Sequence, residues 1–181
     1  MSHTRLFALS LLMAASSSHS FDFNYHSIQL DYLNSEAQKV TSQGYQLKST
    51  QQLNDTMTYS FGLKDVNTQS DETTTSYSLG LGYHMPITTL TDMVMGVSVS
   101  RLQSNAASSD TGRAIEFGLR QQLSSKTEFD FKVVSTYEFG QADTGLAMGL
   151  RSNISDDVSV RGGYQRNEHG DVFSIGLRLE L

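Results

Sequence analysis

The sequence predicts an all-β protein: a closed antiparallel transmembrane β-barrel of ten strands that follows a cleaved signal peptide. Three observations lead to this prediction. Apolar and polar residues alternate strictly in one segment after another, glycines collect on the polar side of that alternation, and aromatic residues collect at the segment ends. Successive side chains of a strand point to opposite faces, so each segment would present one apolar face and one polar face.

The start of the chain has the layout of a secretory signal peptide. A short basic stretch is followed by the apolar run LFALSLLMAA and then by small polar residues. This run is half as long as the roughly 20 apolar residues that a membrane-spanning helix needs. Small residues at Ser18 and Ser20 predict cleavage before Phe21. We therefore expect a signal peptide over 1–20 and a single barrel domain over 21–181.

The alternation defines ten expected strands. It is clearest in SYSLGLGY and in the closing FSIGLRLEL, whereas the first two segments are less regular. If those two are misread, the alternative is a barrel of eight strands. The expected strands are 26–32, 45–53, 58–64, 76–83, 93–100, 115–120, 128–133, 146–151, 158–165 and 173–181.

Alternation alone also fits a soluble β-sandwich, and the glycines favour the barrel. Small residues on the polar face suit a crowded, concave interior, whereas on a solvated face they would only weaken the strands. Of the 14 glycines, eight are expected on the polar face, five in connections and one, Gly162, on the apolar face. The polar-face glycines are Gly62, Gly80, Gly82, Gly96, Gly118, Gly149, Gly163 and Gly176, and those in connections are Gly44, Gly112, Gly140, Gly145 and Gly170.

The aromatic residues and the last strand also favour a membrane barrel. Aromatic girdles are typical of the two membrane interfaces of a barrel. A last strand that pairs with the first leaves no open edge, as lipid requires. An even strand number puts both chain ends on the periplasmic side, with turns near Asn54, 84–91, Ser124 and Ser155, of which the turn over 84–91 is long and holds Pro86, the only proline. The expected aromatic rims are Tyr32, Tyr45, Tyr77, Tyr137, Phe139, Tyr164 and Phe173 on one side, and Tyr83 and Phe129 on the other, and the expected extracellular loops are 33–44, 65–75, 102–113, 140–145 and 166–171.

Four stretches, YHSIQLDYLN, GYQLKSTQQLNDTMTYSFGL, YSLGLGYHMPITTLTDMV and FSIGLRLEL, resemble a family of small, about ten-stranded outer-membrane β-barrel proteins of proteobacteria, many of unassigned function. The resemblance covers most of Tyr25 to Leu181 and is one of rhythm and turns. It implies a barrel in the cell outer membrane and carries over no catalytic or binding residue. Such barrels usually end in Phe or Trp, which the barrel-assembly machinery reads. This chain ends in Leu181, a departure that concerns recognition by that machinery more than the fold.

Thirteen charged residues are expected to face the lumen. Seven are basic and six are acidic, and isolated charges in a narrow lumen are costly. They could line a path for ions or solutes, or they could pair into a salt-bridged polar core, which their near balance favours. These residues are Asp31, Lys48, Lys64, Glu116, Arg120, Glu128, Asp130, Lys132, Glu138, Arg151, Arg161, Arg178 and Glu180.

The expected loops contain few residues that suggest chemistry. His169, near Asp143 and Glu168, could act as a general base at the outer rim, but a solvated turn at Gly170 explains it more simply. The acidic pairs Asp71-Glu72 and Asp156-Asp157 lack the spacing of a calcium site. No nucleophile elbow, phosphate loop or metal-binding pattern is present in the sequence. We therefore expect no catalytic residue, no metal and no cofactor.

These features predict an integral protein of a Gram-negative-type outer membrane with a structural or surface-display role and no enzymatic activity. The alternative is a narrow, porin-like passive pore with weak cation preference, and a more distant one is a lipid-modifying rim enzyme. The expected partners are outer-membrane lipid, lipopolysaccharide and the barrel-assembly machinery. The net charge of −6, with no basic patch, argues against nucleic acid. Polar Ser49 and Gln51 on an expected lipid face suggest either a weak homodimer or a β-bulge.

Overall fold

The computed structural model describes residues 23–37, 40–69, 72–105, 109–168 and 170–181, so the expected signal peptide lies outside the described residues. No helix in the described ranges is long and apolar enough to cross a membrane. The ten strands are β1 (Ser27–Ala37), β2 (Val40–Gln52), β3 (Met57–Thr68), β4 (Thr73–Thr88), β5 (Thr91–Ser104), β6 (Asp110–Ser124), β7 (Thr127–Glu138), β8 (Gln141–Asn153), β9 (Val158–Arg166) and β10 (Gly170–Glu180).

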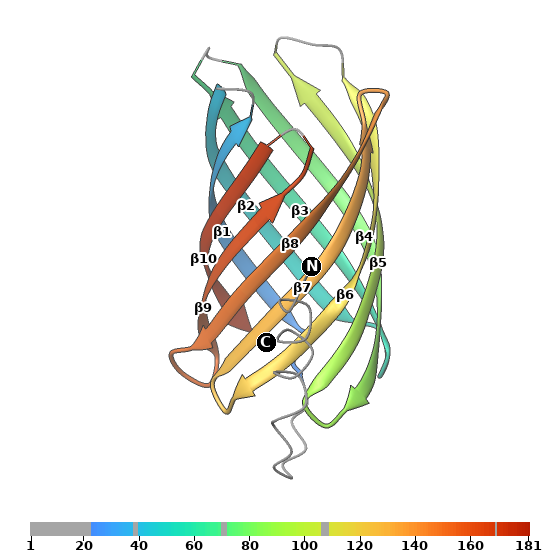
Figure 1. Ribbon diagram of the computed structural model, residues 1–181, viewed down its shortest axis with the longest axis vertical. Coiled ribbons are helices and arrows are strands. Elements are labelled where there is room, and N and C mark those ends of the chain that lie inside the picture. Colours follow the sequence, from blue (N-terminus) through green and yellow to red (C-terminus); the bar gives the residue numbers. More distant parts are fainter. Residues whose placement is uncertain (1–22, 38–39, 70–71, 106–108, 169) are drawn as a thin grey trace, which may run out of the picture.

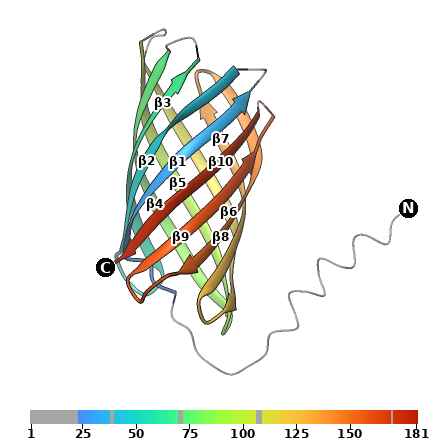
Figure 2. The same cartoon turned by 90° about the vertical axis from the view of Figure 1, so that its left-hand side faces the viewer.

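Each strand pairs antiparallel with its neighbours in the sequence, and β1 closes the ring by pairing with β10 from Ser27↔Glu180 to Ala37↔Gly170. The strands run obliquely around the barrel (Figures 1 and 2). This confirms the predicted closed ten-stranded barrel, and the eight-strand alternative is wrong. Figure 2 shows that β1 begins at the end of the barrel where the chain finishes, and we call it the terminal end.

The barrel is apolar outside and polar inside, the reverse of a water-soluble domain. Within the described part of the chain, the buried hydrophobic residues are Leu33 and Leu102 alone. Eleven polar or charged residues are buried, including Asp31 and Arg151, whereas Leu79, Ile115 and many other large apolar side chains are exposed. Such a surface would be unstable in water, and it matches the apolar band that a membrane barrel presents to lipid.

Aromatic residues pair within this outer surface. Tyr32 and Tyr45 lie opposite each other on β1 and β2, with ring centroids 5.6 Å apart. Tyr164 and Phe173 lie opposite each other on β9 and β10, at 4.9 Å. Aromatic cross-strand pairs of this kind stabilise neighbouring strands.

The strands run well beyond the apolar alternation, so all five expected extracellular loops are too long. The connection expected over 33–44 is strand except between Ala37 and Val40. The expected long turn over 84–91 is also wrong, because β4 continues to Thr88 past a register shift that begins at Pro86. Backbone pairing continues where side chains meet water instead of lipid, and there the ladder gives no hydrophobic signal. The turns expected near Asn54, Ser124 and Ser155 are confirmed.

Because the strands are longer than expected, the predicted positions of several glycines are also wrong. Gly44, Gly112 and Gly145 were expected in connections but are buried in β2, β6 and β8, and Gly170 begins β10. Gly140 does lie in a turn, at φ +78°. The inner face is therefore richer in glycine than predicted, which leaves more room for long inner side chains.

The register along β2 is regular against both of its neighbours. Ser49 lies opposite Ile28 and Phe61, and Gln51 lies opposite Tyr59, all on the outer face. The bulge that could have turned these two polar residues inward is absent from β2, so that explanation of their position is wrong.

Candidate functional site in the lumen

The structure places all thirteen predicted charges in the inner rows of the barrel. Glu180 contacts Arg151 and Arg178, Glu138 lies beside Gly112, and Lys64 follows Gly62 in the inner row of β3. Their use as a path for solutes stays a prediction. The other ten line a cavity of about 370 Å³ inside the barrel: Asp31, Lys48, Glu116, Arg120, Glu128, Asp130, Lys132, Arg151, Arg161 and Arg178.

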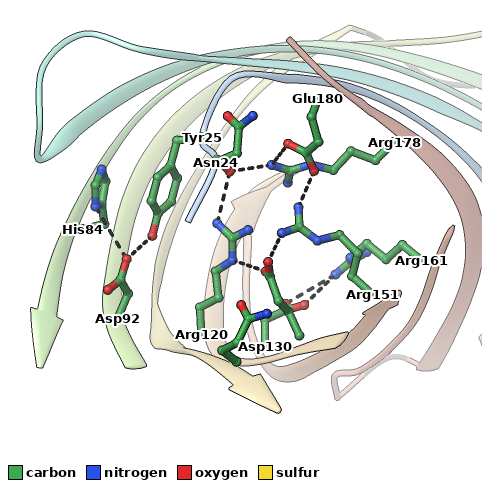
Figure 3. A network of polar contacts seen from close by, with 12 residues as sticks. Asn24, Tyr25, His84, Asp92, Arg120, Asp130, Arg151, Arg161, Arg178 and Glu180 are labelled. Atoms are coloured by element: carbon green, nitrogen blue, oxygen red, sulfur yellow. Dashed lines mark hydrogen bonds and ion pairs between the residues drawn. The ribbon is translucent and has the colours of Figure 1, made fainter. Parts of the chain in front are cut away.

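Five of these residues form a continuous chain of ion pairs near the terminal end. Arg120 Nε donates to Glu128 Oε2 at 2.6 Å, and the other oxygen of Glu128 contacts Arg151 Nη2. Arg151 Nη1 and Arg178 Nε both donate to Glu180 Oε1, each at 2.8 Å. Figure 3 shows this network from close by. We call it the terminal-end ion-pair chain: Arg120, Glu128, Arg151, Glu180 and Arg178.

The terminal-end ion-pair chain spans the inner wall from β6 to β10, and its side chains are 7–15 % exposed. Buried charges of this kind persist only when each is paired. The strand β9 lies between Arg151 and Glu180, and it presents there the fully buried Ser159. A larger inner residue on β9 would obstruct the contact between Arg151 and Glu180, so the sequence of β9 permits this link.

Two further ion pairs lie along the same wall. Lys132 Nζ is 3.1 Å from Glu116 Oε1, and Arg161 Nη2 is 3.4 Å from Asp130 Oδ1. The second pair crosses β8 directly over Gly149, where a methyl group would overlap both side chains. Glycine therefore makes the pairing across β8 sterically possible.

The opposite wall is built mainly from small residues. The inner rows of β3 to β5 carry Thr58, Ser60, Gly80, Gly82, Gly96 and Ser98, and all six line the cavity. Charge is thus concentrated on β6 to β10, and space is left in front of β3 to β5. The cavity results from this asymmetry, and Lys48 on β2 borders it as well.

A second cluster, which the sequence analysis missed, forms where residues 23–26 enter the terminal end. Tyr25 stacks on His84 with ring centroids 3.7 Å apart, and its hydroxyl donates to Asp92 Oδ2 at 2.6 Å. Burial raises the pKa of Tyr25 above its usual value, with Arg120 opposing this effect, so the phenol remains a hydrogen-bond donor. Strand alternation could have shown that His84 and Asp92 face inward, but nothing in the sequence indicated that Tyr25 meets them.

The expected rim residues give no site within the described ranges. His169 and Asp71 lie outside the described residues. The backbone N–H of Glu168 donates to Asp143 Oδ1 at 3.1 Å, which brings these two hairpins together. Among the described residues, no group of three or more His, Cys, Asp or Glu side chains could hold a metal ion.

We expect Gly149→Ala to lower the free energy of unfolding by about 1–3 kcal/mol, because the added methyl group must displace both Asp130 and Arg161. The matched control is Gly162→Ala on the neighbouring strand. Nothing lies within 4 Å of a Cβ placed there, so its effect should stay within about 0.5 kcal/mol. Denaturant titration of the refolded barrels measures both, and equal losses would contradict the steric argument.

The chain is similar to known proteins in fold and not in sequence. No protein-family model and no curated protein matches the sequence. Among solved structures, the β domain of the Bordetella autotransporter BrkA is similar at a TM-score of 0.57 and 10% identity, covering 88% of this chain and 100% of that chain. An outer membrane channel from Pseudomonas putida F1 is similar at a TM-score of 0.55 and 8% identity, covering 92% and 99%.

At these identities the likeness concerns the fold alone, and both similar structures are barrels of the outer membrane. The apolar outer belt and the polar lumen of this chain are independent evidence for a barrel that lies in lipid. The chain is an outer-membrane β-barrel protein.

Proposed function

We propose that this protein is a structural or surface-display barrel, without enzymatic activity, whose lumen is largely closed by paired charges. The observation that carries the proposal is the terminal-end ion-pair chain. An eight-stranded barrel is just filled by its side chains, whereas 16 or more strands leave an aqueous channel. Ten strands are close to the filled end of that range, and five charged side chains occupy this part of the lumen.

The orientation that we propose has the terminal end in the periplasm. Both described chain ends lie there, which suits a signal peptide that is removed after export. The hairpins β1–β2, β3–β4, β5–β6, β7–β8 and β9–β10 would then extend outside the cell. Polar outward side chains at those hairpin ends, such as Asp65, Arg101 and Arg166, support this assignment.

A narrow passive pore is the second candidate, and one observation favours it. The cavity of about 370 Å³ between the charged wall and the small residues of β3 to β5 is wide enough to hold water or a small solute. Acidic residues on the hairpins, among them Glu36, Asp65 and Asp143, would give such a pore a weak preference for cations. No described feature favours the lipid-modifying rim enzyme.

The proposed partners are outer-membrane lipid, lipopolysaccharide and the barrel-assembly machinery. A weak homodimer is part of the proposal, because Ser49 and Gln51 are polar groups on a face where lipid is the alternative neighbour. Contact between two copies along β2 would let these side chains form hydrogen bonds that lipid tails cannot offer.

Planar-bilayer recordings of the refolded protein test the two candidates against each other. We expect little or no single-channel conductance, because an ion must pass the terminal-end ion-pair chain, whose groups are already paired and buried. Weak cation selectivity is expected for any residual current. Large, steady currents from the unmodified protein would overturn the structural proposal and favour the pore.

A further inference from the structure

The segment that precedes β1 crosses the lumen. In the ring of ten strands, β1 and β6 are separated by four strands in either direction, so they face each other across the barrel. Arg120 of β6 nevertheless lies over the ring of Phe23 at 4.6 Å and over the ring of Tyr25 at 4.9 Å. A chain that leaves β1 and makes these contacts must pass through the terminal mouth of the barrel.

Four strands hold this segment in place. Its Tyr25 stacks on His84 of β4 and donates a hydrogen bond to Asp92 of β5, as Figure 3 shows. The carbonyl oxygen of Asn24 accepts hydrogen bonds from Arg178 of β10 at 2.8 Å and from Arg120 of β6 at 3.4 Å.

These anchors are buried or paired with other charges. His84 and Asp92 are 7% and 5% exposed, and Arg120 and Arg178 belong to the terminal-end ion-pair chain. Cation–π contacts and hydrogen bonds to charged groups gain strength where water is excluded. The segment therefore lies in a site of complementary chemistry.

The contacts of this segment are separate from the backbone hydrogen bonds that pair the strands of the barrel. The backbone carbonyl of His26 still accepts a hydrogen bond from the backbone of Leu181. Within the described ranges, residues 23–25 make no backbone–backbone hydrogen bond with a strand. They are held by side chains and by one carbonyl, so they could leave the mouth without breaking any pairing between strands.

We propose that Phe23–Tyr25 is a plug that closes the terminal mouth, and that its withdrawal connects the cavity of about 370 Å³ to the periplasmic side. The plug and the ion-pair chain close the lumen together, because the plug rests on Arg120 and Arg178. The proposal goes beyond the structural role, because it assigns closure of the terminal mouth to three residues that could leave the mouth without breaking any pairing between strands.

The test compares a mature chain that begins at Phe21 with one that begins at His26, both refolded and recorded in planar bilayers. We expect the shortened chain to raise the ratio of open to closed time by roughly tenfold or more, the equivalent of losing one charge-assisted hydrogen bond. Unheated gel migration shows that each barrel is closed. Equal ratios in two folded barrels would overturn the plug.

Point variants provide an independent test of the plug if the shortened chain does not fold. Tyr25→Ala removes the stacking on His84 and the hydrogen bond to Asp92 while the backbone remains. Its matched control is Tyr59→Ala, on the outer face of β3. Tyr25→Ala should raise the open ratio and Tyr59→Ala should not, and the same ratio in both variants would overturn the plug.

Thiol chemistry supplies a second readout, because the natural chain has no Cys. Ser98→Cys places one thiol at the cavity. A water-soluble thiol reagent should modify it several-fold faster when residues 21–25 are removed, and an unchanged rate would count against the plug. Little or no current with equal labelling rates in the two chains would overturn the plug and leave the structural role intact, so failure of the plug can be told apart from failure of the structural role.

Discussion

Val97→Arg is expected to block barrel assembly, whereas Ser98→Arg, one residue further along, is expected to allow it. Val97 lies at the middle of β5, is 54% exposed, and has Leu81 and Ile115 beside it on the outer face. A basic residue on the lipid face near the bilayer midplane costs roughly 2–4 kcal/mol. That is a large fraction of the stability of an ordinary domain.

The control works because neighbouring residues of a strand point to opposite faces. Ser98 borders the cavity beside Gly80, Gly96 and Glu116, so an added guanidinium has space and a carboxylate nearby. Outer-membrane fractionation and the gel position of unheated samples measure assembly. Equal impairment by the two arginines, or greater impairment by Ser98→Arg, would mean that the lipid and lumen faces are assigned the wrong way round.

This facing could be predicted from the sequence because lipid imposes a strict period of two. Val97 and Ser98 differ in polarity for that reason alone, and the same contrast is repeated around the ring. Where the strands leave lipid, the contrast ends although the ladder continues. Asp65 and Arg101 lie on the outer face beyond the apolar rows and look like loop residues in the sequence. Strand ends were therefore predicted too early.

The inward direction of the charges could be predicted, but their partners could not. The pair of Arg161 with Asp130 joins β9 to β7 across the intervening β8. Such contacts depend on how far each strand is shifted along its neighbour, which alternation does not specify. The contacts of Tyr25 were harder still, since residues 23–25 follow no strand pattern and their position depends on groups from β4, β5, β6 and β10.

Glu128→Ala is expected to cause the largest loss of stability of any single change proposed for this barrel. Glu128 is the carboxylate that joins Arg120 to Arg151, and its side chain is 11% exposed. In the part of the chain that the structure describes, Arg120 has no other carboxylate partner, so removal of Glu128 leaves it unpaired with any acid. Arg151 keeps its ion pair with Glu180. Breaking a buried ion pair by removing one partner typically costs about 3–5 kcal/mol.

Two controls separate charge loss from general damage. Glu128→Gln keeps the shape and one acceptor oxygen, so it should lose less than Glu128→Ala. Arg166→Ala breaks an ion pair with Asp171 that spans 3.9 Å between side chains 74% and 40% exposed, and it should cost less than about 1 kcal/mol. Denaturant midpoints of the three refolded variants give the ranking. If Glu128→Ala were as stable as Arg166→Ala, water would have to solvate Arg120 freely, and the lumen at the terminal end would be open instead of closed.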